Sequence, residues 1–175
     1  HKATPAHTDG FAYGDRYPDY MLLSCVQESA KGGESVLIDG YRIEQYLQTH
    51  PDFSWAGHAL AEVVIDQTED NMQTALSPII MNNGHGRKMV RKTLNQKPCA
   101  DSKDSERDAR MIALWCDTIN AAYALAPRFK LRAGQKLIVD NYRLMHGRDP
   151  YEDLQRMLWR VWVWTTDALG VPCLL

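Results

Sequence analysis

The sequence has few cysteines, no long apolar run and no block of like charge. Its four cysteines lie far apart and form no CxxC pair, which excludes a zinc ribbon and a thioredoxin-type redox motif. The longest apolar runs, such as Leu158–Trp164, are too short to span a membrane, and this one contains Arg160. Twenty basic side chains stand against 22 acidic ones without clustering, so no nucleic-acid-binding surface is expected.

The length and composition are those of one ordinary globular domain. Hydrophobic residues make up 45% of the 175 residues and charged residues 24%. A chain of this length buries a core that needs neither a disulfide framework nor a metal for stability. We expect a single domain over residues 1–175. The absence of a secretory leader favours a cytoplasmic location.

Short stretches rich in apolar, β-branched or aromatic residues predict strands, mostly towards the two ends of the chain. They are Tyr20–Val26, Ser35–Ile38, Glu62–Ile65, Pro78–Met81, Lys136–Asp140 and Arg156–Thr165. The first two are separated by Gly32-Gly33, which predicts a turn and an antiparallel hairpin. Asn82-Asn83-Gly84 predicts a second turn.

Two segments are typical of helices. Tyr41–Leu47 predicts a short helix that ends near His50-Pro51, and Ser105–Ala126 predicts a long one with apolar residues recurring on one face. Ser105 is the expected N-cap of the long helix, and Pro127 ends it. Short strands with one long helix late in the chain favour a mainly β fold, a sandwich or jelly roll with helical insertions, over a doubly wound sheet.

Three residues form a candidate metal site. His7 and Asp9 are two apart, so on a strand they would face the same side, although such a pair often arises by chance. A second histidine, His146, follows the predicted strand Lys136–Asp140 and a turn at Asp140-Asn141. Two histidines and one carboxylate on one face of an iron ion leave the open positions that non-haem Fe(II) oxygenases require.

Three other histidines compete for the role of second histidine ligand. They are His50, His58 and His85. Their neighbours (Thr-His-Pro, Gly-His-Ala and Gly-His-Gly) are more typical of surface turns than of a metal site. We therefore prefer His146.

The last predicted strand places several unusual side chains together. Strand alternation puts Arg156, Leu158, Arg160 and Trp162 on one face. Burying two arginines on so hydrophobic a strand is costly unless they meet anions, and the guanidinium group matches a carboxylate with two hydrogen bonds. The alternative is an edge strand whose arginines face solvent.

Several blocks occur in order along the chain: the His7-Thr8-Asp9 motif, YPDYMLLSCVQESAKGGESVLIDGY, LIVDNYRLMHGR and RMLWRVWV. Together they resemble the TauD/TfdA superfamily of Fe(II)/2-oxoglutarate-dependent dioxygenases, in particular its γ-butyrobetaine hydroxylase and clavaminate-synthase-like branches. The resemblance covers Pro5–Asp39 and Lys130–Trp164 well and the middle poorly. It implies a double-stranded β-helix (jelly roll) with helical insertions. In that family a core strand precedes the HxD motif, so we expect a catalytic domain without its N-terminal portion.

Carried over residue by residue, the resemblance assigns the metal and the cosubstrate. It implies that His7, Asp9 and His146 bind Fe(II). Arg156 matches the family arginine that pairs with the distal carboxylate of 2-oxoglutarate. Ser35, in the GGES block, stands where the family has a Ser or Thr that hydrogen-bonds this cosubstrate.

The resemblance also suggests substrate contacts. Arg160 matches a second arginine that, in some members, helps to hold an anionic group, and Trp162 falls where the betaine hydroxylases have a cage aromatic. Tyr13 follows the metal motif and is a further candidate contact, although a loop tyrosine more often packs or forms part of a lid.

The predicted function is hydroxylation, with O2, of a small polar molecule that bears a carboxylate or another anion, such as an amino acid or a betaine, with succinate and CO2 as co-products. The carboxylate of Asp9 favours hydroxylation, because related halogenases lack this ligand. Desaturation or cyclisation at the same iron is an alternative, as is a non-catalytic jelly-roll module that binds a metal or an anion. A zinc hydrolase is another, but it leaves the GGES block and Arg156 unexplained. The expected partner is a small molecule, and a homo-oligomer is compatible with the sequence.

Overall fold

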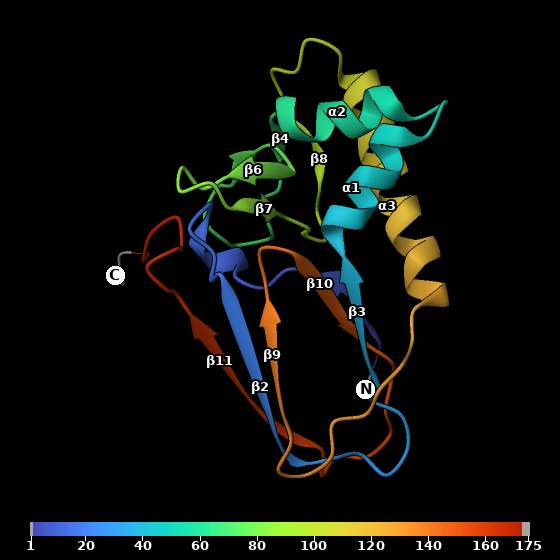
Figure 1. The fold of residues 1–175 in the computed structure, drawn as a ribbon, viewed down its shortest axis with the longest axis vertical. Helices are drawn as coiled ribbons and strands as arrows, with labels where there is room; N and C mark the ends of the chain where they lie inside the picture. Colours follow the sequence, from blue (N-terminus) through green and yellow to red (C-terminus); the bar gives the residue numbers. More distant parts are fainter. Residues whose placement is uncertain (1, 173–175) are drawn as a thin grey trace.

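The computed structural model describes residues 2–172. In chain order its elements are β1 (Thr4–His7), the 3-10 helix η1 (Phe11–Tyr13), β2 (Tyr20–Gln27), β3 (Ser35–Asp39), α1 (Gly40–Thr49), α2 (Ser54–Glu62), β4 (Ile65–Asp66), β5 (Leu76–Ser77), β6 (Ile80–Asn82), β7 (Lys88–Val90), β8 (Lys97–Pro98), α3 (Ser105–Leu125), β9 (Lys136–Asp140), β10 (Leu144–Arg148) and β11 (Met157–Val163). The three α-helices gather beside the β1–β10–β3 strands, and β2, β9 and β11 lie on the other side of the molecule (Figure 1).

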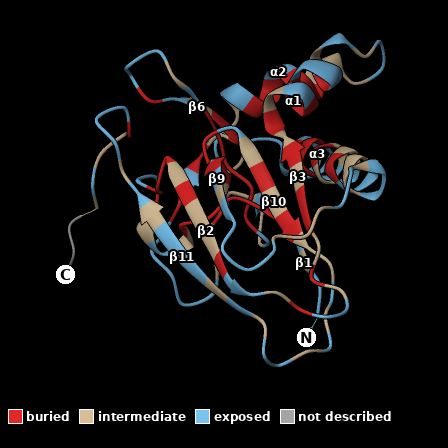
Figure 2. Ribbon diagram, turned by 60° about the horizontal axis from the view of Figure 1, so that its bottom comes forward, coloured by how far each residue is buried: buried red, intermediate tan, exposed pale blue. Residues whose placement is uncertain are grey.

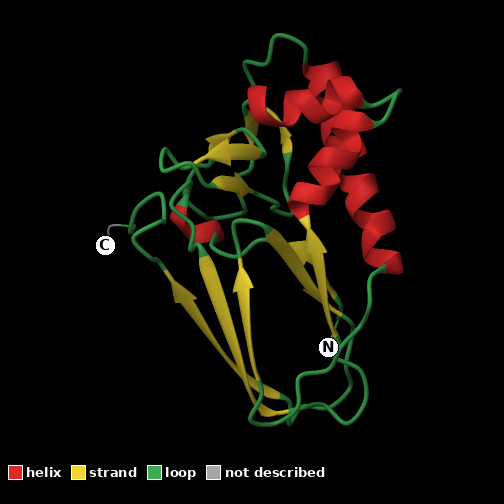
Figure 3. Ribbon diagram, in the orientation of Figure 1, coloured by secondary structure: helices red, strands yellow, loops and turns green. Residues whose placement is uncertain are grey.

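Two three-stranded antiparallel sheets form the larger part of the β structure, in the orders β1-β10-β3 and β11-β2-β9. The strands of each sheet come from both ends of the chain, so the ends depend on each other for their hydrogen bonds. The middle of the chain adds a small β5-β4-β8 sheet and the β6-β7 hairpin, which turns at Gly84 as the sequence predicts (Figure 3).

Strand alternation divides the β1-β10-β3 sheet into a helix-covered face and an open face. Val36, Ile38 and Met145 point into a hydrophobic core that the helices complete. Their main partners in the helices are Ile43, Leu47, Ala56, Leu60, Met111, Trp115 and Ile119. The alternate residues, such as Leu37 and its register partner His146, face the opposite side, towards the β11-β2-β9 sheet. Figure 2 shows buried residues concentrated where the helices meet this sheet.

The N-cap of the long helix α3 lies one residue before the one that the sequence predicts. The side chain of Asp104 accepts a hydrogen bond from the backbone N–H of Arg107, so Asp104 and not Ser105 is the N-cap. The carboxylate also suits the positive end of the helix dipole. The helix ends at Leu125, ahead of Pro127, as predicted.

The antiparallel hairpin predicted for Tyr20–Val26 and Ser35–Ile38, which correspond to β2 and β3, is wrong. β2 pairs with β9 and β11, whereas β3 pairs with β10 in the other sheet. Gly32 and Gly33, both at positive φ, carry the chain from one sheet to the other, and the N–H of Gly33 donates to the carbonyl of Pro150. The chain bends at Ala30 and Lys31, and Gly32 forms an isolated antiparallel bridge with Tyr151, so this segment is a crossing between the two sheets and not the predicted hairpin turn.

The helices form a larger part of the fold than the sequence predicts. Helix α2 was missed, and the strand expected at Glu62–Ile65 is reduced to β4. The buried residues of α2 include Gly57, where a Cβ would lie 2.4 Å from the backbone nitrogen of Gln48. This glycine lets α2 lie directly against α1, so the fold is a mixed one of helices and small antiparallel sheets. No helix among residues 2–172 is long and apolar enough to cross a bilayer.

Candidate metal centre

His7, Asp9 and His146 come together at one end of the β1-β10 pair. His7 and His146 are direct partners in the strand register, and their ring centroids are 4.4 Å apart. The Oδ1 atom of Asp9 lies 3.5 Å from Nε2 of His7 and 3.6 Å from Nε2 of His146. One ligand atom from each residue lies within 4.8 Å of the others, and in residues 2–172 no other group of His, Cys, Asp or Glu does this. Two imidazoles and one carboxylate in this arrangement fit a divalent iron ion.

Asp9 reaches the site in a different way from the one expected. It is not on a strand with His7 but in a bend just after β1. The side chain of Asn141 holds this bend: its Oδ1 accepts from the N–H of Asp9 at 2.8 Å, and its Nδ2 donates to the carbonyl of Asp9 at 3.1 Å and to that of Pro18 at 2.7 Å. Asn141 lies in the turn predicted before His146, and its side chain ties that turn to the other half of the site.

The protonation states suit metal binding. Burial lowers the pKa of His146, which favours the neutral imidazole. Burial alone would raise the pKa of Asp9, but hydrogen bonds with His146 and His7 outweigh it and hold that pKa well below its usual range. Nδ1 of His7 lies 2.9 Å from the carbonyl of Pro5, so the tautomer that donates there leaves Nε2 available as a ligand atom. Nδ1 of His146 is buried and has no hydrogen-bond partner in the described part of the chain.

Two side chains from β11 bind the carboxylate of Asp9. Arg160 donates from Nη1 to Oδ1 at 3.0 Å, and Trp162 donates from Nε1 to Oδ2 at 2.7 Å. The guanidinium of Arg160 also lies over the Trp162 ring, 4.9 Å from its centroid. Tyr13, at the end of η1, meets the Trp162 ring edge-on at 5.6 Å. The three predicted substrate contacts are therefore neighbours beside Asp9.

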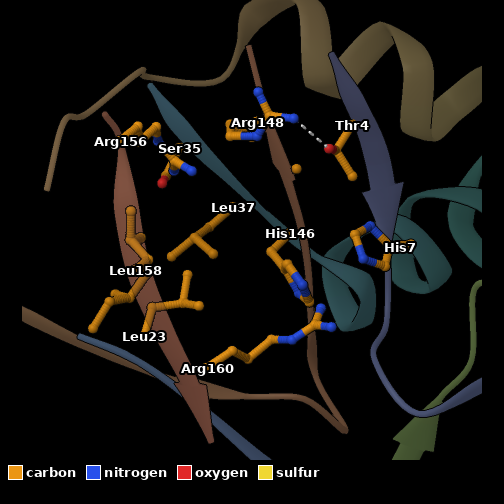
Figure 4. Close-up of a pocket in the computed structure, with 12 residues that line it drawn as sticks. Thr4, His7, Leu23, Ser35, Leu37, His146, Arg148, Arg156, Leu158 and Arg160 are labelled. Atoms are coloured by element: carbon orange, nitrogen blue, oxygen red, sulfur yellow. Dashed lines mark hydrogen bonds between the residues drawn. The ribbon is translucent and has the colours of Figure 1, made fainter. Parts of the chain in front are cut away.

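A cavity of about 240 Å³ opens from the metal site between the two large sheets (Figure 4). It is lined by Thr4, His7, Leu23, Ser35, Leu37, Leu137, His146, Gly147, Arg148, Arg156, Leu158 and Arg160. The cavity brings the two histidines together with both predicted cosubstrate residues, Ser35 and Arg156. The alternation predicted for the last strand is also found, since Leu158 and Arg160 face the cavity together with Arg156, which lies just before β11.

Positive charge and hydroxyl groups mark one end of this cavity. Ser35 pairs in register with Arg148, two residues along the strands from the pair of Leu37 and His146, a step of roughly 7 Å. The guanidinium groups of Arg148 and Arg156 both lie over the ring of Tyr151, 4.5 and 4.9 Å from its centroid. Burial and the charge of Arg156 lower the pKa of Arg148. No carboxylate is among the residues that line the cavity, so this end suits an anion.

The sequence did not single out Arg148 or Tyr151 as part of this end. Arg148 lines the cavity and donates to the hydroxyl of Thr4 at 3.0 Å. Arg148 is the last residue of the LIVDNYRLMHGR block that contains His146, so its position beside the site had a signal in the sequence. Tyr151 has no comparable signal, because nothing in its local sequence shows that two arginines meet its ring.

The competing histidines lie elsewhere. The ring of His50 stacks on Phe53 with centroids 4.2 Å apart, His58 is exposed on α2, and His85 is exposed in the β6-β7 turn. None of the three belongs to the cluster around Asp9.

Comparison with known protein families agrees with this geometry. A family model described as "Taurine catabolism dioxygenase TauD, TfdA family" matches residues 1–162. The chain belongs to the TauD/TfdA family. The matched range includes every residue of the candidate metal centre and every predicted cosubstrate residue.

Solved structures of oxygenases share the fold. A structure of asparagine oxygenase with Fe(II), 2S,3S-3-hydroxyasparagine and succinate is 20% identical, with a TM-score of 0.70, over 93% of this chain and 50% of that one. PvcB from Pseudomonas aeruginosa is 18% identical, with a TM-score of 0.68, over 96% and 59%. The non-haem iron oxygenase OrfP with Fe and α-ketoglutaric acid is 19% identical, with a TM-score of 0.64, over 91% and 48%. This chain thus spans about half the length of these proteins.

Proposed function

We propose that this chain carries the active site of an Fe(II)/2-oxoglutarate-dependent oxygenase that hydroxylates a small molecule bearing an anionic group, with an amino acid as the favoured class. The observation that carries the proposal is a single cavity with a His-Asp-His cluster at one end and Ser35, Arg148 and Arg156 at the other. Membership of the TauD/TfdA family supports the same reaction. We further propose that the two large sheets belong to a double-stranded β-helix.

In this proposal His7, Asp9 and His146 hold Fe(II). The metal, when bound, supplies the activation of O2 that is coupled to the oxidative decarboxylation of 2-oxoglutarate to succinate and CO2. The chain's own contribution is to fix the ligands. The hydrogen bond between Nδ1 of His7 and the carbonyl of Pro5 fixes the orientation of the His7 ring. The side chain of Asn141 fixes the backbone bend that contains Asp9.

Arg156 and Ser35 are the proposed partners of the distal carboxylate of 2-oxoglutarate. A guanidinium group donates two parallel hydrogen bonds to a carboxylate, and a hydroxyl adds a third. The step of roughly 7 Å along the strands from His146 to the level of Ser35 suits a short dicarboxylate with one end at the metal. Leu23, Leu37 and Leu158 line the space between and keep water from the methylene carbons.

Arg160, Trp162 and Tyr13 stay proposals as substrate contacts. The side chain of Arg160 contacts Asp9 and is 48% exposed. Its positive charge is therefore accessible from solvent beside the proposed metal site and would attract an anionic substrate. The neighbouring structures support an amino acid, because two of them hold 2S,3S-3-hydroxyasparagine and (3S)-hydroxy-L-Arg. Asp9 supports hydroxylation, because the carboxylate ligand is present. A cytoplasmic location stays a prediction.

The test is substrate-dependent formation of succinate. The protein, with Fe(II), 2-oxoglutarate and O2, is incubated with a panel of L-amino acids and betaines, and succinate and the mass of each amino acid or betaine are measured. We expect succinate to rise with at least one amino acid, which gains the mass of one oxygen atom, and to fall to background in His146→Ala. Absence of succinate in a protein that binds Fe(II) and 2-oxoglutarate points to a binding module. Binding of Zn(II) without any 2-oxoglutarate binding overturns the proposal.

A further inference from the structure

Two tryptophans near the end of β11 contact the same tyrosine but have different hydrogen-bond partners. Trp162 and Trp164 both meet the ring of Tyr13 edge-on, with centroid distances of 5.6 and 5.2 Å and interplanar angles of 89° and 88°. The indole N–H of Trp162 donates to Oδ2 of Asp9 at 2.7 Å, whereas that of Trp164 donates to the carbonyl of Arg16 at 2.9 Å. Only Trp162 therefore touches the metal centre.

The two oxygens of Asp9 have different neighbours. Oδ1 faces Nε2 of His7 and Nε2 of His146 and also accepts from Arg160. Oδ2 accepts from Trp162. Because Asn141 already fixes the backbone of Asp9, the side-chain torsions are the freedom that is left, and the bond from Trp162 restricts them. The carboxylate is held with Oδ1 towards the histidines.

We propose that Trp162 is a positioning residue for Asp9, a role that rests on the proposed iron site. Its indole N–H holds Oδ2 away from the metal and presents Oδ1 as a single ligand atom. An indole is neutral, so it stabilises the carboxylate without adding a positive charge that would repel a divalent cation. This role differs from the cage aromatic that the sequence suggests, because it uses the edge of the ring and not its face.

The test compares Trp162→Phe with Trp164→Phe by anaerobic titration with Co(II), which reports both affinity and ligand geometry through its visible bands. Each substitution keeps an aromatic ring against Tyr13 and removes one indole N–H. Partners that orient metal ligands typically contribute 10–100-fold to affinity, so we expect the Kd for Co(II) to rise by roughly that factor in Trp162→Phe, with shifted bands. Trp164→Phe should match the wild type. Thermal unfolding of the metal-free proteins checks that both variants are folded.

The outcomes separate the inference from the proposed function. If the wild type binds no Co(II), the proposed metal site itself fails. If the wild type binds and Trp162→Phe binds equally tightly with unchanged bands, or Trp164→Phe loses as much affinity, the positioning role of Trp162 is overturned while the metal site stands.

A second measurement covers the case in which Trp162→Phe does not fold. In protein with 15N-labelled tryptophan, one indole N–H resonance should move when Zn(II) is added and should also move in metal-free Asp9→Asn. If none of the five indole N–H resonances shifts on addition of Zn(II) or in Asp9→Asn, the hydrogen bond between Trp162 and Asp9 is contradicted.

Discussion

Asn141 and Asp9, 132 positions apart in the sequence, exchange two buried hydrogen bonds through the side chain of Asn141 and the backbone of Asp9. The backbone N–H of Asn141 also donates to the carbonyl of Asp19. The turn between β9 and β10 is thereby fastened to the bend after β1. Since His146 follows that turn and Asp9 lies in that bend, one asparagine sets the spacing between two proposed metal ligands from the two ends of the chain.

Replacing Asn141 with Ala should destabilise the protein. The change leaves the N–H of Asp9 and the carbonyls of Asp9 and Pro18 without their partner in a fully buried place, and each unsatisfied group costs about 1–3 kcal/mol. We expect the free energy of unfolding, measured with urea, to fall by about 3 kcal/mol. Asn120, exposed on α3, is the matched control, and its replacement by Ala should change stability little. Equal losses in both variants would contradict the role of Asn141.

Gly33→Ala should weaken the binding of 2-oxoglutarate. Gly33 has a φ of +78°, and a Cβ there would lie 3.1 Å from Nε of Arg156, so the added methyl group displaces that side chain. Gly84 has the same φ but nothing within 4 Å of its Cβ position. Both substitutions place a Cβ at a positive φ, which costs roughly 1–2 kcal/mol of stability. Only Gly33→Ala should also raise the Kd for 2-oxoglutarate, measured by calorimetry on the metal-loaded protein. If Gly84→Ala raises that Kd equally, Gly33 does not seat Arg156.

Arg156→Ala should separate cosubstrate binding from metal binding. Hydrogen bonds to charged groups contribute about 1.5–3 kcal/mol, so the Kd for 2-oxoglutarate should rise roughly 10- to 100-fold. The affinity for Fe(II) should stay near that of the wild type, because Arg156 lies at the other end of the cavity. Arg156→Lys, which keeps the charge but not the paired donors, should fall between the two. An unchanged affinity for 2-oxoglutarate in Arg156→Ala would refute the assignment.

Asp39→Asn should remove part of the pH dependence of stability. Burial opposes ionisation of Asp39, but hydrogen bonds from Arg143 and from the first turn of α1 outweigh it and lower its pKa. A lowered folded-state pKa contributes stability above the unfolded-state pKa of about 4, and this is lost as the pH falls through the folded-state value. At pH 7 we expect a loss of about 1 kcal/mol in urea unfolding, which shrinks below pH 4. Exposed Asp101→Asn is the control, and a pH-independent difference for Asp39→Asn would contradict the assignment.

Local sequence was a good guide where the structure is decided locally. The long helix, the strand Lys136–Asp140 and the turn at Gly84 follow from periodicity and turn chemistry, and the structure contains all three. The clustering of the two histidines with Asp9 could be predicted because the sequence blocks around them occur in a characteristic order, although the spacing of His7 and Asp9 alone is common. The alternation of Arg156, Leu158 and Arg160 was also readable from the strand pattern alone.

Features that depend on distant segments were not readable. β2 and β3 are adjacent in sequence but join different sheets, where β2 pairs with β9 and β11 and β3 pairs with β10. Helix α2 depends on the fit of Gly57 against α1. The edge of the Trp162 ring meets Asp9 only once β11 lies beside the bend after β1, so a face-on role was the natural reading of the sequence.

The most direct test of the proposed active site is an anaerobic titration of the metal-free protein with Fe(II) and then 2-oxoglutarate, followed by visible absorption. We expect the charge-transfer band of the chelated complex to appear with both present and to be absent in His7→Ala and His146→Ala. A folded wild-type protein that shows no band and no Fe(II) binding in competition with a coloured chelator would contradict the account.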